Sequence, residues 1–155
     1  MITAHKASFG IGFVTGLRSM TASAALSWAA SLGRTRIGWI PAGGRVRALA
    51  TAAAFSEMAG DKMPFAPDRR IMPSFLLRIA IGGVGGAALA ERDASLLGGA
   101  LYGMAGAVVG TLLGRAARGG TTRSRTDWAR ALTEDTVAAG LAAALVHGAG
   151  RRSPA

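Results

Sequence analysis

Paired charges stand out between residues 54 and 70, because the sequence on either side of them is largely apolar. Glu57 and Asp61 are four residues apart, which places both carboxylates on one face of a helix. Lys62 and Arg69 follow within the same stretch. The carboxylates could bind a cation or relay a proton, and the cations could hold a phosphate or another anion. The alternative is a set of ion pairs that only holds helices together, or an interfacial charge cluster.

Other charges fall inside apolar segments, where a charge is costly in a bilayer and is functional by default. Arg18 and Ser19 follow three glycines near the middle of an apolar run, so the sequence predicts a loosened or broken helix there. A guanidinium beside free backbone N–H groups could bind a phosphate or carboxylate. Arg78 and Glu134 lie in later apolar segments. For Arg18 the alternative is a side chain that snorkels to the interface.

The composition favours a membrane protein. Hydrophobic residues make up 50% of the 155 residues, and residues 94–114 contain no charge, a length sufficient to cross roughly 30 Å of hydrocarbon. The net charge of +10 is spread mainly between the apolar segments, which favours contact with anionic lipid head groups over nucleic acid. Cysteine is absent and the two histidines lie near opposite ends, so we predict no metal site and no cofactor.

We therefore predict an all-α fold, a polytopic membrane helix bundle of about five segments within one integral membrane domain, 1–155. The first segment is too long and too charged for a signal peptide, and it is the one expected to be broken. Glycines four residues apart, such as Gly82 with Gly86 and Gly99 with Gly103, predict faces where helices pack closely. The predicted segments are 7–32, 45–63, 74–90, 94–114 and 126–147.

A short internal similarity suggests an inverted repeat. Residues 54–57 and 131–134 share the order Ala, apolar, hydroxyl, Glu, each within an Ala-rich helix. If residues 6–63 and 94–148 are the two halves, residues 70–92 form a linker helix between them. Three crossings then separate the matched elements, so the halves have opposite orientations, as in many transporters. The similarity is four residues deep, and we treat the repeat as a hypothesis.

The same residues also resemble a known family. The motifs concerned are Gly16-Leu17-Arg18-Ser19, Glu57 with Asp61-Lys62-x-Pro64, Pro67-x-Arg69, and Arg78. In these motifs the chain is similar to the small bacterial integral membrane proteins grouped as domain of unknown function 4126. The resemblance implies a multi-pass protein of the bacterial cytoplasmic (inner) membrane. It singles out Arg18, Glu57, Asp61, Lys62, Arg69 and Arg78, and it names no substrate.

The expected function is that of a small membrane transporter or channel-like protein for an ion or small anionic solute. In this hypothesis Arg18 and Arg78 contact the anionic group, while Glu57 and Asp61 bind the coupling cation or relay a proton. The alternative is an anionic-lipid-binding or scaffolding protein without transport, and an enzyme acting on lipid phosphate has the least support. Because short Ala- and Gly-rich helices enclose little interior, we also expect a homo-oligomer.

Overall fold

The fold is all-α. A computed structural model describes residues 5–60, 72–117 and 125–150, which form six helices and contain no strand. The helices are α1 (Lys6–Leu17), α2 (Ser19–Ser31), α3 (Gly44–Gly60), α4 (Met72–Ala88), α5 (Leu96–Ala117) and α6 (Arg125–Gly150). The all-α prediction is confirmed. The described helices number six rather than about five because the first predicted segment is divided at Arg18.

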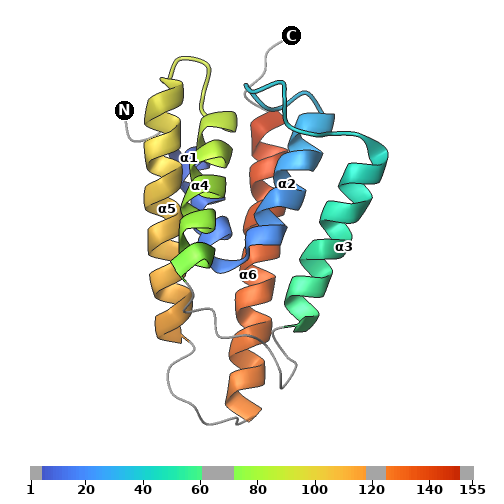
Figure 1. Ribbon diagram of the computed structural model, residues 1–155, viewed down its shortest axis with the longest axis vertical. Coiled ribbons are helices and arrows are strands. Elements are labelled where there is room, and N and C mark those ends of the chain that lie inside the picture. The colour runs from blue at the N-terminus through green and yellow to red at the C-terminus, as the bar shows by residue number, and fades with distance from the viewer. Residues whose placement is uncertain (1–4, 61–71, 118–124, 151–155) are drawn as a thin grey trace.

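The two parts of that segment form a helical hairpin. α1 descends beside α5, with Gly12 against Gly103, and α2 then rises against α3, where Trp28 Nε1 donates to Thr51 Oγ1 at 3.2 Å. α1 therefore begins, and α2 ends, at the same end of the bundle (Figure 1). The predicted break is confirmed, and the chain reverses its direction at the break instead of continuing as one long segment.

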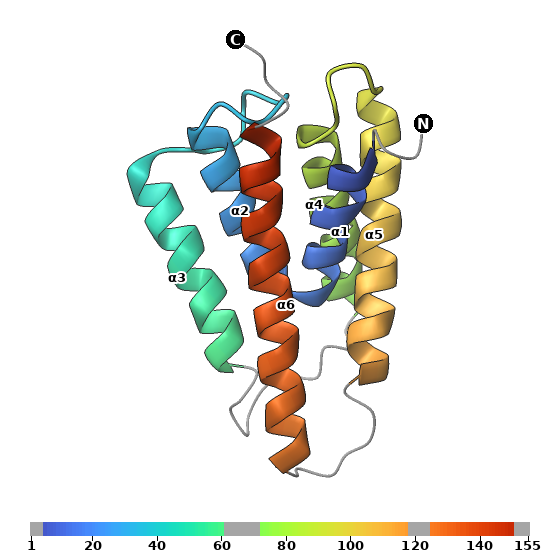
Figure 2. The ribbon, with the colours of Figure 1, turned by 180° about the vertical axis from the view of Figure 1, so that it is seen from behind.

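The four longer helices surround this hairpin. α1 packs mainly on α5 and α4, whereas α2 packs on α3 and α6. Seen from behind, α6 lies in front of the hairpin and runs along the length of the bundle (Figure 2). The helices alternate in direction from α1 to α6, so α6 ends where α1 begins. The turn of the hairpin is thereby enclosed by helices on several sides.

Glycines allow these close contacts. A Cβ added at Gly82, Gly86 or Gly103 would overlap backbone atoms of the facing helix in the α4–α5 pair. Gly16 meets the backbone of α5 at Ala107 in the same way, which brings the end of α1 directly onto α5. The predicted glycine packing faces are therefore confirmed for these residues.

One helix among the described residues, over Leu96–Ala116, is long and apolar enough to cross a membrane, and the apolar stretch Ser74–Ala88 is shorter. α1 and α2 have only 12 and 13 residues. α5 is one uninterrupted helix of 22 residues, whereas its counterpart in the repeat hypothesis is the α1–α2 hairpin. These two elements differ in shape, although Glu57 and Glu134 both reach the hairpin turn.

Candidate functional site

The candidate site is built around the turn between α1 and α2. Arg18 is the single residue between the two helices and has an extended backbone, with φ −145° and ψ 103°. Its N–H donates to Val14 O at 2.7 Å and its carbonyl accepts from Ala22 N at 3.2 Å, so each helix continues up to it. Such an abrupt turn leaves the last carbonyls of α1 and the first N–H groups of α2 without helical partners. Those groups determine which side chains can lie around the turn.

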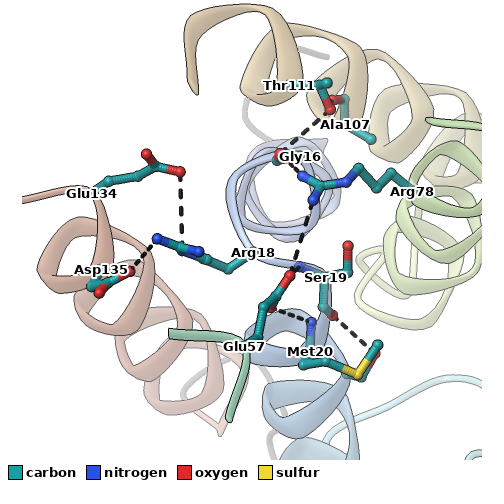
Figure 3. Close-up of polar contacts among 11 residues, drawn as sticks. Gly16, Arg18, Ser19, Met20, Glu57, Arg78, Ala107, Thr111, Glu134 and Asp135 are labelled. Atoms are coloured by element: carbon teal, nitrogen blue, oxygen red, sulfur yellow. Dashed lines mark hydrogen bonds and ion pairs between the residues drawn. The ribbon is translucent and has the colours of Figure 1, made fainter. Parts of the chain in front are cut away.

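A guanidinium faces the carbonyl end of α1. Arg78 Nη1, from the first part of α4, donates to the carbonyl oxygen of Gly16 (Figure 3). Thr111 Oγ1 on α5 also lies 3.4 Å from that oxygen and donates to Ala107 O at 2.8 Å. Because the carbonyl end of a helix carries partial negative charge, the positive side chain of Arg78 is well placed there. Arg78 is 7% exposed.

A carboxylate faces the other helix end at the turn, the N-terminal amides of α2. Glu57, near the end of α3, accepts from Ser19 N at 3.2 Å and from Met20 N at 2.9 Å (Figure 3). The arrangement resembles helix N-capping, with the capping carboxylate supplied by another helix. Glu57 Oε1 also lies 4.0 Å from Arg78 Nη2. The Glu57–Arg78 pair therefore spans the break and complements the dipoles of both half-helices.

On the other side of the turn, the Arg18 side chain is directed to α6. Its Nη2 lies 2.7 Å from Asp135 Oδ1, and its Nε lies 4.0 Å from Glu134 Oε1. Arg18 is 1% exposed and Asp135 is 7% exposed. A buried charge is tolerated when it has a partner of opposite sign, so the arginine and the α6 carboxylates depend on one another. This pair connects the turn to α6.

The site therefore gathers two guanidiniums and three carboxylates from the described residues around a broken helix. The carboxylates of Glu134 and Asp135 are adjacent in sequence and share Arg18. Neighbouring carboxylates supply oxygen ligands of the kind that bind a small cation. The arrangement can accordingly hold or exchange a small positive charge, and its arginines supply donors for an anion.

The structure brings together five of the eight residues predicted for the site. Arg18, Ser19, Glu57, Arg78 and Glu134 all lie at the turn. Asp61, Lys62 and Arg69 lie outside the described residues. Arg78 donates to a backbone carbonyl and Arg18 lies beside carboxylates, while their predicted contact with an anionic solute stays a prediction. Glu57 contacts backbone N–H groups and Arg78.

Sequence reasoning did not include Asp135, an acidic partner of Arg18, in the site. The signal was present, since Asp135 follows Glu134 directly, but sequence spacing does not say which of two adjacent side chains faces inward. The Gly16 carbonyl and the Met20 N–H were also missed, because backbone groups become ligands only where the chain turns. Thr111 gave no signal within its uncharged run.

The chain was also compared with known proteins. No protein-family model, no curated protein and no solved structure matches it. The resemblance to the domain of unknown function 4126 family, based on short motifs around Arg18, Glu57 and Arg78, stays a prediction.

Proposed function

We propose that this chain is a multi-pass protein of the bacterial cytoplasmic membrane that transports or conducts a small ion. The proposed site is the charged turn of the α1–α2 hairpin. The observation that carries the proposal is the enclosure of Arg18, at 1% exposure, between two half-helix ends and two carboxylates of α6. Broken helices with charges at the break are the usual form of ion and substrate sites in transporters.

The distribution of side chains supports a membrane location. Arg18, Arg78 and Asp135 are buried, while long apolar side chains are exposed on the longer helices. Examples are Leu49 (71%) on α3, Phe55 (68%) on α3, Leu76 (60%) on α4, Leu97 (71%) on α5 and Leu141 (38%) on α6. Buried charge with an apolar exterior reverses the pattern of soluble proteins and suits a surface in contact with lipid.

The depth of the turn supports the same proposal. Gly16 packs against α5 at Ala107, which is roughly 17 Å along that helix from Leu96 at 1.5 Å per residue. Asp135 lies roughly 15 Å from the start of α6 by the same measure. If α5 crosses the bilayer, the turn is near its middle, where irregular backbone is tolerated only inside protein or beside water.

Carboxylates outnumber guanidiniums among the described residues at the turn, and this balance favours a proton or small inorganic cation as the ion carried. Glu134 and Asp135 are then the groups that exchange it, and Arg18 is the counter-charge that competes for them. The rival function, an anionic-lipid-binding or scaffolding protein without transport, accounts less well for this site. Lipid head groups lie at the membrane surface, whereas the Arg18 cluster lies deep among the helices.

The proposal is tested with purified protein in proteoliposomes. A pH-sensitive dye and potassium-, sodium- and chloride-sensitive dyes are used to follow flux under an imposed gradient. Wild-type protein is expected to carry protons or one cation, and the rate is expected to fall at least tenfold in Asp135→Asn and Glu57→Gln. Asp93→Asn, which removes an exposed carboxylate in the α4–α5 turn, serves as the control with unchanged flux. Absence of flux, flux of anions only, or full flux in both variants would contradict the proposal.

A further inference from the structure

A second charged site lies at the end of the bundle where α2, α4 and α6 finish. It is a cavity of about 680 Å³ between the loop after α2, the turn between α4 and α5, and the end of α6. The volume falls within the roughly 300–1,000 Å³ typical of small-ligand sites. Three arginines and two carboxylates line it, namely Arg34, Arg36, Arg92, Glu91 and Asp93.

Two of the arginines are held in place by backbone carbonyls. Arg36 Nη1 donates to Glu91 O at 2.8 Å and Ala94 O at 2.5 Å, beyond the end of α4. Arg34 Nη1 donates to Val146 O at 2.7 Å in the last turn of α6. The Arg34 guanidinium complements the dipole of α6, whereas the Arg36 guanidinium binds the turn between α4 and α5. These bonds hold both guanidinium groups in place before a ligand arrives. Less side-chain entropy is therefore lost when a ligand binds.

Each of these guanidiniums keeps donors for a ligand. A guanidinium has five N–H groups, and in the described part of the chain Arg36 and Arg34 use only Nη1. Nε and Nη2 of each side chain remain to meet an oxyanion, and the fork of donors on a guanidinium matches a phosphate group. The arginine part of the cavity is accordingly suited to phosphate.

The remaining charges favour a ligand that also carries an amine. Glu91 and Asp93 bring two carboxylates to the same cavity, at the exposed turn that follows α4. A plain phosphate would be repelled by them, whereas a ligand with an ammonium group a few bonds from its phosphate would satisfy both signs. Apolar side chains are exposed at this end of the bundle, namely Leu32 (50%), Trp39 (68%) and Leu97 (71%). They provide contacts for acyl chains beside a charged head group.

We propose that this cavity binds the phosphoethanolamine head group of a membrane lipid. The phosphate contacts Arg34 and Arg36, and the ammonium group contacts Asp93 and Glu91. The proposal rests on the membrane location in the proposed function, but it does not depend on ion transport. The cavity is formed by the bundle end, whereas the transport site is the hairpin turn within the bundle.

The first test compares ligands. Detergent-purified protein is titrated by calorimetry with O-phosphoethanolamine, inorganic phosphate and ethanolamine, and it is examined by native mass spectrometry after equilibration with phosphatidylethanolamine or phosphatidylglycerol. We expect phosphoethanolamine to bind at least tenfold more tightly than phosphate or ethanolamine, and phosphatidylethanolamine to be retained in preference to phosphatidylglycerol. The proposal would be overturned if phosphate bound as tightly as phosphoethanolamine, or if both lipids were retained equally. It would also be overturned if the free head group bound but the lipid was not retained, or if nothing bound.

The second test uses variants of the cavity. Asp93→Asn removes one carboxylate with little change in shape, and Arg34→Lys keeps the charge but loses the fork of donors. Each is expected to weaken phosphoethanolamine binding about tenfold or more, as the loss of a charge-assisted hydrogen bond would. Arg45→Ala removes an exposed cation outside the cavity and should change nothing. Melting temperatures show whether each variant is folded. Unchanged phosphoethanolamine binding in folded Asp93→Asn would overturn the assignment. Ion flux measured on the same variants tests the hairpin turn separately, so failure of the lipid site and failure of the transport site can be distinguished.

Discussion

Arg18 is the only residue between α1 and α2, and its Nη2 is 2.7 Å from Oδ1 of Asp135 on α6. The contact joins a turn in the first quarter of the chain to the last helix. Because both side chains are buried, neither charge can be solvated by bulk water if the other is removed. The Arg18–Asp135 pair therefore contributes both to the geometry of the hairpin and to the charge of the proposed site.

Asp135→Asn is expected to destabilise the protein by about 3 kcal/mol, the lower part of the range for breaking a buried ion pair, since Glu134 still lies near Arg18. Unfolding by a denaturing detergent, followed by circular dichroism or tryptophan fluorescence, gives the free energy. The matched control is Asp93→Asn, an exposed carboxylate whose loss should change stability by no more than about 0.5 kcal/mol. Equal stability of the two variants would show that the Arg18–Asp135 pair contributes nothing.

Substitution of Glu57 should reveal its role as the cap of α2. Glu57→Ala removes the acceptor for Ser19 N and Met20 N and is expected to cost about 2 kcal/mol. Glu57→Gln keeps one acceptor oxygen and loses the charge, so about half of that cost is expected. The same unfolding measurement compares them. If the glutamine variant were no more stable than the alanine variant, hydrogen bonding to the helix end would not be the cause.

Close packing of α1 on α5 predicts that Gly12→Ala is poorly tolerated. The added Cβ would overlap the backbone of Gly103, and relief requires the helices to move apart, at a cost of about 1–3 kcal/mol. Gly140→Ala on α6 is the matched control, because no atom beyond its own stretch of helix lies within 4 Å of the added Cβ. That change should be neutral or stabilising by about 1 kcal/mol, since alanine favours helix. A neutral Gly12→Ala would mean that α1 and α5 are not packed at this glycine.

Much of the fold was predictable because its signals are local. Glycine spacing identified the packing faces of α4 and α5, and the glycines before Arg18 marked the break. The direction of the chain after the break was not predictable. A helix that bends and continues has the same local sequence as one that turns back, and the difference depends on contacts with α3 and α6 that lie far away in the sequence.

The candidate site was predictable to a similar degree. Charges within apolar runs identified Arg18, Glu57, Arg78 and Glu134, since burial of charge is rare enough to be informative. Their partners were predicted less well. Arg78 pairs with a backbone carbonyl that exists as a free acceptor only because α1 ends at Leu17. The backbone groups that bind the charged side chains, and the pairing of Arg18 with Asp135, both depend on the tertiary arrangement.

The re-entrant hairpin in a membrane is the central claim, and sidedness of labelling tests it most directly. The chain has no cysteine, so Lys6→Cys, Trp39→Cys and Arg115→Cys can each be introduced alone and treated with a membrane-impermeant maleimide in sealed, oriented vesicles. All three positions are exposed. We expect Lys6→Cys and Trp39→Cys to react from the same side and Arg115→Cys from the other. Reaction of Lys6→Cys and Trp39→Cys from opposite sides, or of all three from one side, would contradict the account.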